Sequence, residues 1–147
     1  MKYSEGNIGR LFVVSLDDGD KLPSAIENFA AEKGIERGMC ILVGGIDDGG
    51  NIVVGPKDRH TMPPEPMLFK LMGVHEVSAV GTLFPDAGGK PRLHMHAAFG
   101  RSGETHTGCI RPGVEVWKLG EFILLEILNN HAARRRSPET GFDVLEA

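Results

Sequence analysis

The chain has 147 residues, of which 41% are hydrophobic, and its 16 Lys and Arg against 20 Asp and Glu give a formal net charge of -4. This size suits one hydrophobic core, so we expect residues 1–147 to form a single domain. The negative charge excludes a general electrostatic attraction to nucleic acid, so any contact with DNA needs a local basic patch.

The segments that would direct the chain to a membrane or out of the cell are missing from the sequence. No stretch is both apolar and long enough to span a bilayer, and the first residues, MKYSEGNIGR, lack the apolar region of a signal peptide. We therefore expect a cytoplasmic protein with no membrane partner. The two cysteines, Cys40 and Cys109, are too few for a disulfide framework, and both thiols should be reduced in the cytosol.

The N-terminal part of the chain predicts one strand and one helix. Phe and Val side chains favour a strand over residues 10–16, which ends in the turn sequence Asp-Asp-Gly-Asp. In the helix that follows, Asp20 is expected as the N-cap, Pro23 in the first turn, and Gly34 at the C-terminal end. Three apolar side chains share one face of this helix: Leu22, Ile26 and Phe29.

Strands dominate the rest of the chain. A loop with four prolines is expected at residues 55–66, and a short polar segment at residues 130–140 precedes a final strand. One helix before so many strands predicts an α+β fold, with one main helix packed on a mixed, largely antiparallel sheet. The expected strands, in chain order, are residues 39–43, 51–54, 67–72, 75–84, 92–99, 104–110, 114–117 and 121–128.

The segment RLHMHAAFGRSGETHTGC, residues 92–109, has the composition of a metal site. Side chains two residues apart on a strand point to the same face, so the imidazoles of His94 and His96 can converge on one ion. Two imidazoles make only half of a tetrahedral zinc shell. A functional site also needs a third protein ligand, which the next strand of the hairpin must supply.

Two residues compete to be that third ligand, and the length of the turn decides between them. If residues 101–103 form a three-residue loop, the returning strand places His106 on the face of the two histidines. If the loop is one residue longer or shorter, Cys109 lies on that face instead. The same strand cannot present both residues without a bulge. A thiolate favours zinc, whereas a third imidazole also suits iron, nickel or copper.

Four charged residues near the histidines have two interpretations each. Glu76 and Glu121 either orient a ligating imidazole or activate a bound water, or they are surface or interface groups on their strands. Arg92 and Arg111 flank the two hairpin strands, where they either hold an anion beside the metal or are exposed charges at the edge of the sheet. No catalytic residue can be assigned, because the nucleophile, phosphate-loop and His-Glu-x-x-His motifs are all missing from the sequence.

The hairpin segment resembles the PPC domain (plants and prokaryotes conserved domain), whose prokaryotic members show a His-x-His strand, a hairpin turn and a Gly-Gly-His-Leu segment. The stretch LDDGDKLPSAIENFAAEKGIERG is similar to the family's opening strand, acidic-glycine turn and helix. GVHEVSAVGTLF matches its Gly-x-x-Glu-hydrophobic strand, and the late FILLEI and TGFDVL fit its final strands. The resemblance thus extends over most of the chain.

This resemblance implies a compact α+β subunit assembled as a homotrimer, with a metal held by histidines in some prokaryotic members. The family's His-x-His pair falls on His94 and His96. Its Gly-Gly-His-Leu segment falls on Thr107-Gly108-Cys109-Ile110, so that Cys109 occupies the position of the third histidine. The resemblance therefore favours Cys109 over His106 as the third ligand.

Residues and resemblance together predict a metal-containing binding or regulatory domain, with zinc as the first choice and another divalent transition metal as the second. Its partner would be a small-molecule ligand or a protein. Two other functions are considered, a zinc-dependent hydrolase or lyase with an open metal position, and a DNA-associated regulator. Plant relatives bind DNA through an Arg-Gly-Arg-Pro AT-hook. This chain has only the run Arg134-Arg135-Arg136, interpreted as a solvated or structural segment, so we expect weak DNA binding.

Overall fold

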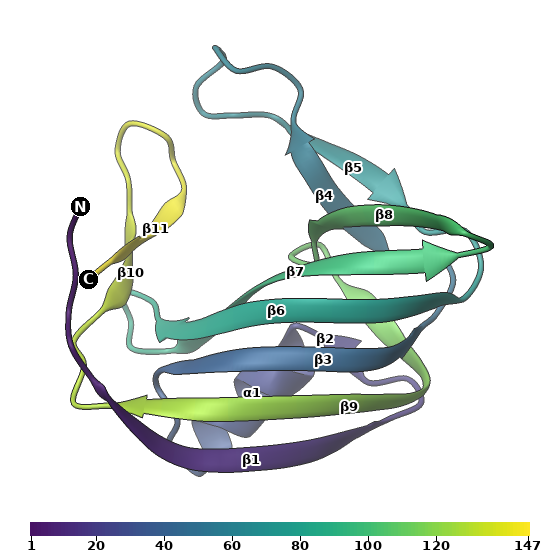
Figure 1. Ribbon diagram of the computed structural model, residues 1–147. Coiled ribbons are helices and arrows are strands. Elements are labelled where there is room, and N and C mark those ends of the chain that lie inside the picture. Colours follow the sequence, from purple (N-terminus) through teal and green to yellow (C-terminus); the bar gives the residue numbers. More distant parts are fainter.

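One large antiparallel sheet organises the structure, and the computed structural model describes residues 1–147 (Figure 1). Its strand order is β1-β9-β3-β6-β7-β8-β4-β5, and the short β2 pairs with β9. The elements are β1 (Asn7–Asp17), β2 (Lys21–Leu22), α1 (Ser24–Lys33), β3 (Gly38–Ile46), β4 (Asn51–Pro56), β5 (Pro66–Lys70), β6 (His75–Pro85), β7 (Pro91–Arg101), β8 (Glu104–Cys109), β9 (Val114–Leu128), β10 (Ala133–Arg136) and β11 (Asp143–Glu146).

The expected combination of one helix and many strands is confirmed, but the expectation of a mixed sheet is wrong. Every strand pair is antiparallel. Parallel neighbours need a long crossover connection, usually a helix. Here short turns join β6 to β7 and β7 to β8, and the loop of residues 57–65 joins β4 to β5, and each connection reverses the chain direction between neighbours.

The helix α1 covers one face of the sheet, which we call the inner face (Figure 1). It begins after Pro23 with no side-chain cap, so the expected N-cap role of Asp20 is wrong. The Asp20 carboxylate instead accepts a hydrogen bond within the turn after β1, and the residues between form β2. The end at Gly34 is confirmed, with φ of 65°. No helix of the chain is long and apolar enough to cross a membrane.

The core lies between α1 and the inner face. Ile26 of α1 packs there with side chains that alternate along the strands, such as Leu42 of β3 and Met95 and Phe99 of β7, all at most 2% exposed. The opposite face, which we call the outer face, carries the residues in between, including His94 and His96. Strand alternation thus separates the core from the candidate metal ligands on β7.

Strand β9 is one continuous element, where two strands were expected at residues 114–117 and 121–128. The break between those segments is a bulge. The register against β3 shifts between Gly44 and Gly45, and Lys118 has a positive φ of 64°. The backbone N–H of Lys118 donates to the Asp18 carboxylate at 2.7 Å, which holds the bulge in place.

The C-terminal hairpin of β10 and β11 forms a separate two-stranded sheet beside one end of the large sheet (Figure 1). Residues 130–140, expected as a short polar segment before a final strand, contain the strand β10, and β11 follows them. Arg134 within β10 is only 8% exposed, and its Nη2 donates to Thr82 Oγ1 at 3.1 Å. This contact ties β10 to β6 and places the Arg134 side chain near the strand that carries His94.

Candidate metal centre

The turn between β7 and β8 is one residue shorter than the three-residue loop considered from the sequence. Arg101 pairs with Glu104, so only Ser102 and Gly103 connect the strands, with φ of 53° and 84°. Two central residues with positive φ match the twist of a two-residue hairpin, and glycine adopts this backbone without steric cost. This register places Cys109 opposite His96.

Three donor side chains meet on the outer face. One ligand atom each from His94, His96 and Cys109 lies within 4.8 Å of the other two. The two imidazole rings are 5.0 Å apart between centroids and nearly perpendicular, at 82°. His94 is half-buried, His96 is exposed, and the Cys109 thiol is buried. His94 and His96 lie on β7 and Cys109 lies on β8. The register of these two strands brings the two imidazoles and the thiol to one point.

Close packing of β4 against β8 fixes the backbone beside Cys109. A Cβ added at Gly108 would lie only 2.6 Å from the backbone oxygen of Val53, a distance that side chains do not tolerate. Val53 is also the β4 residue that pairs with Cys109. A glycine at this position thus lets β4 pair closely with β8 beside Cys109.

His106 lies away from the three donors. It pairs with Phe99, whose side chain is in the core, and its ring stacks on Phe69 with centroids 4.0 Å apart and planes at 28°. Of the two candidates for the third ligand, the structure brings Cys109 to the histidines and leaves His106 apart. Metal ligation by these residues stays a prediction.

The three donors fit a tetrahedral zinc shell in chemistry and in spacing. Zinc–nitrogen distances of about 2.0 Å and zinc–sulfur distances of about 2.3 Å put neighbouring donors about 3.3 to 3.6 Å apart. Donor atoms within 4.8 Å reach this spacing by small side-chain rotations. Three protein ligands leave a fourth position for water or a ligand, as in catalytic and substrate-binding zinc sites.

The surroundings of His94 keep its imidazole neutral. Burial is the main cause that lowers the pKa of His94, and the positive charge of Arg134 and the neighbouring His96 and Arg111 lower it further, to about 4. A neutral imidazole is the form that binds a metal ion. Near neutral pH, His94 therefore needs to lose no proton before it coordinates.

Glu76 and Glu121 lie outside the metal centre. Glu76 pairs with Gly100, at the far end of β7 from His94. Glu121 lies on β9, which β3 and β6 separate from β7. Both side chains are exposed on the outer face. Within the subunit, the structure supports the interpretation of these carboxylates as surface or interface groups.

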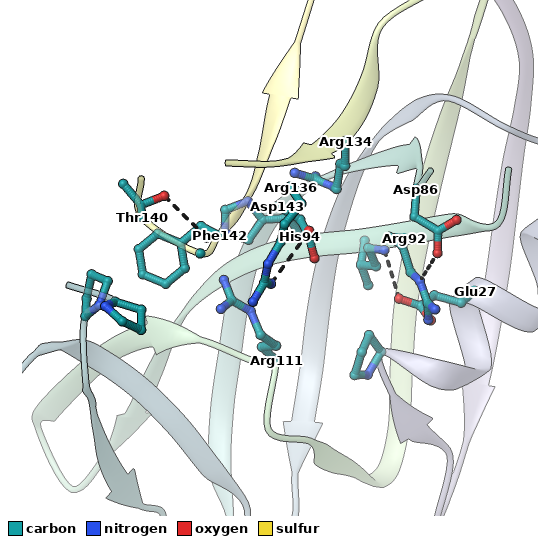
Figure 2. A pocket seen from close by; sticks show the side chains of 15 residues that line it. Glu27, Asp86, Arg92, His94, Arg111, Arg134, Arg136, Thr140, Phe142 and Asp143 are labelled. Atoms are coloured by element: carbon teal, nitrogen blue, oxygen red, sulfur yellow. Dashed lines mark hydrogen bonds and ion pairs between the residues drawn. The ribbon is translucent and has the colours of Figure 1, made fainter. Parts of the chain in front are cut away.

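Arg92 and Arg111, which the sequence analysis treated together, have different surroundings in the structure. Arg92 forms ion pairs with Asp86 and Glu27, at 2.9 and 3.2 Å, whereas Arg111 has no carboxylate partner. Arg134, interpreted as part of a solvated or structural run, lines the same cavity as Arg111 and His94 (Figure 2). No alternation along β10 signals it, because Ala133 and Arg134 are both buried and Arg135 and Arg136 are both exposed.

Comparison with known proteins identifies relatives of the whole fold. A PPC protein from Pyrococcus horikoshii superposes with a TM-score of 0.86 at 23% identity, over 100% of this chain and 98% of its own. A metal-containing protein from Archaeoglobus fulgidus gives a TM-score of 0.84 at 28% identity, over 100% of both chains. A candidate DNA-binding protein from Bacteroides thetaiotaomicron gives 0.72 at 21% identity, over 97% and 98%.

The sequence itself matches a family pattern over most of its length. No match was found among curated protein sequences. The pattern of the Plants and Prokaryotes Conserved (PCC) domain, the PPC domain named above, matches residues 3–128, which include β1 to β9 and all three donors. The chain therefore belongs to the Plants and Prokaryotes Conserved domain family.

Proposed function

We propose that this PCC-domain protein is a zinc-containing binding or regulatory module, with one zinc ion per subunit held by His94, His96 and Cys109. The observation that carries the proposal is the meeting of these three donors within 4.8 Å. Bound there, zinc would supply a Lewis-acidic fourth position for a ligand.

The donor set favours zinc over other divalent metals. A thiolate with two imidazoles suits zinc, whereas Mg²⁺ and Ca²⁺ prefer oxygen ligands, and no carboxylate belongs to the group of close donors. The relative from Archaeoglobus fulgidus is described as metal-containing, which supports a metal in this fold but does not identify it.

The same set favours binding over hydrolysis. A zinc hydrolase or lyase needs a general base within hydrogen-bond reach of the open position. Glu76 and Glu121, the carboxylates considered for that role, lie elsewhere on the sheet. A binding or sensing role needs no general base and therefore agrees better with the site.

The proposed assembly is a homotrimer formed through the outer face. Val80 lies in register between Ile41 and His96, so this apolar surface reaches the metal centre. Large apolar patches on a sheet face mark contact surfaces between proteins. The apolar side chains exposed there by 42 to 77% are Leu11, Val13, Met39, Ile41, Val43 and Val80. Sedimentation equilibrium should give three times 15.9 kDa, and the mass of one chain at micromolar concentration would refute the trimer.

DNA binding is the weaker alternative, although the relative from Bacteroides thetaiotaomicron is a candidate DNA-binding protein. With a net charge of -4, we expect duplex binding weaker than about 10 μM at physiological salt. Submicromolar, sequence-selective binding in a mobility-shift experiment would favour the regulator instead.

Metal analysis tests the proposed function directly. Purified protein, loaded with zinc and dialysed, should contain one zinc per chain by plasma emission spectroscopy. Less than about a tenth of that amount after loading would overturn the proposal, because a zinc ion held by three protein ligands should stay bound through dialysis.

A further inference from the structure

A cavity of about 590 Å³ opens beside His94 (Figure 2). The β10–β11 hairpin forms one wall, and Pro63 and Pro64 from the loop after β4 form another. These walls nearly touch, since a Cβ added at Gly141 would lie 3.2 Å from Pro63 Cβ. The lining is rich in charge, with four arginines and three carboxylates: Arg92, Arg111, Arg134, Arg136, Glu27, Asp86 and Asp143.

Two of the four arginines are neutralised within the cavity wall. Arg92 pairs with Asp86 at 2.9 Å and with Glu27 at 3.2 Å, and Arg136 lies 3.8 Å from Asp143. These pairs use all three carboxylates. Arg111 and Arg134 therefore remain without an ion-pair partner.

Arg134 is a buried cation with unused hydrogen-bonding capacity. It is 8% exposed, its Nη2 donates to Thr82, and its Nε has no partner. Buried guanidinium groups are normally paired, because an unpaired buried charge is costly. The arrangement is that of a site whose counter-ion comes from a ligand.

Arg111 adds a second positive charge to the same place. Burial is the main cause that lowers the pKa of Arg134, and the charge of Arg111 is the next cause. The Arg111 guanidinium carbon lies 6.0 Å from the centre of the Phe142 ring. In Figure 2, Arg134 reaches in from β10 and Arg111 from the loop after β8, with His94 between them in the view.

A second cavity, of about 420 Å³, adjoins the first and is mainly apolar. Pro64, Arg111 and Phe142 line both cavities, and His96 and Cys109 line the second. The metal centre therefore faces both spaces, one with uncompensated positive charge and one with apolar walls.

We propose that Arg111 and Arg134 bind the oxyanion of a small-molecule ligand, a phosphate monoester or a carboxylate, whose apolar part lies in the adjoining cavity against Phe142. The two guanidinium groups supply the charge-assisted hydrogen bonds that such oxyanions accept. The site does not depend on zinc, so it goes beyond the proposed metal function. A small ligand fits this site better than duplex DNA, because Arg134 is only 8% exposed.

Calorimetric titration with inorganic phosphate, phenyl phosphate and benzoate tests this site, in zinc-loaded and in metal-free protein. Phenyl phosphate or benzoate should bind more tightly than inorganic phosphate, and should bind without the metal as well. Arg111→Gln and Arg134→Gln should each weaken binding about tenfold or more, because each removes a hydrogen bond to a charged group. Arg135→Gln is the matched control, since this neighbour is exposed and should leave the affinity within about twofold.

Three results would overturn the proposal. The first is no binding of any probe up to about 10 mM in folded protein. The second is an equal loss of affinity in Arg111→Gln and Arg135→Gln, which would indicate an effect of net charge rather than a site. Because Arg111 is exposed, Arg111→Gln tests the site even where Arg134→Gln fails to fold. The third is binding that disappears with the metal and is insensitive to Arg111→Gln, which would place the anion on zinc alone. Failure to bind zinc would instead refute the metal function and leave the anion result standing.

Discussion

The two ends of the β7–β8 hairpin both carry histidine, but only one end brings donors together. At the open end, His94, His96 and Cys109 share the outer face and lie within 4.8 Å. At the turn end, His106 points the other way and stacks on Phe69. The difference lies in strand register, because a shift of one residue moves a side chain to the opposite face.

His75 on β6 is a second histidine that lies away from the three donors. It lines a cavity of about 260 Å³ with His106, yet it is buried and its Nδ1 lies 2.8 Å from the Gly73 carbonyl oxygen. A backbone partner and an aromatic neighbour account for these two histidines without a metal. Residue type alone therefore does not define a metal site, and the geometry of the donors does.

The strongest way to break this comparison is to remove ligands from the open end. His94→Ala and His96→Ala should each weaken zinc binding more than about 100-fold, since loss of a direct ligand exceeds the effect of an outer-shell change. Zinc competition with a chromophoric chelator measures this. His106→Ala is the control at the turn end and should bind zinc as the wild type does; the reverse pattern would place the metal at the turn.

Replacement of the thiol should have the next largest effect. Cys109→Ser also removes a direct ligand and should weaken zinc binding about 100-fold, because a serine hydroxyl is a poorer zinc ligand than a thiolate, and it should abolish the thiolate charge-transfer band of the cobalt-substituted protein. Cys40→Ala is the matched control, because Cys40 is in the core and burial raises the pKa of its thiol to about 12. A band that survives in Cys109→Ser and disappears in Cys40→Ala would contradict the assignment.

Acid should destabilise the metal-free protein through His94. The pKa of folded His94 is lowered to about 4, so an unfolded chain with a histidine pKa of about 6.5 takes up the proton first as pH falls. The free energy of unfolding should therefore be fully retained above about pH 6.5 and decrease toward pH 4, by about 1 kcal/mol because half-exposed His94 is partly screened by solvent.

Urea unfolding of wild type and His94→Gln, at about pH 7 and about pH 5, isolates this contribution. The wild type should lose more stability than the variant between the two pH values. His60→Gln, at an exposed loop position, should behave like the wild type. Equal losses in wild type and His94→Gln would show that His94 does not titrate in this range.

Much of the fold could be predicted from the sequence, because helices and strands leave a pattern of apolar side chains over a few neighbouring residues. Gly34 at the helix end and most strands follow from backbone preference and alternation. The helix start could not, since Asp20 is drawn into a turn and residues 21–22 pair with β9 instead. The bulge at Lys118 depends on Asp18, about a hundred positions away, and interrupts the strand pattern of one continuous strand.

The third metal ligand was predicted as a choice between two residues. Of the two arginines in the proposed anion site, Arg111 was considered for such a role and Arg134 was not. His-x-His places two imidazoles on one face whatever the turn, but the third donor depends on whether Ser102 and Gly103 alone make the turn. Arg134 was interpreted as part of a solvated or structural run. Its burial comes from contact with Thr82 on β6, and the local sequence does not encode that contact.

The smallest expected effect is on stability, at the turn end of the hairpin. His106→Ala removes the ring stacked on Phe69 and should lower the free energy of unfolding by about 0.5 to 1.5 kcal/mol. Thermal or urea unfolding of the metal-free variant measures it. Because the ring makes no contact with the open end, the zinc affinity should stay unchanged; a loss of affinity comparable to that of His96→Ala would show that the two ends are coupled.

X-ray absorption spectroscopy at the zinc edge tests the central assignment most directly. The zinc-loaded wild type should show one sulfur at about 2.3 Å and three nitrogen or oxygen neighbours at about 2.0 to 2.1 Å, with imidazole scattering from two histidines. Cys109→Ser should lose the sulfur shell, and His106→Ala should keep the spectrum unchanged. A wild-type spectrum without sulfur, or one with three imidazoles that changes in His106→Ala, would contradict a centre built from His94, His96 and Cys109.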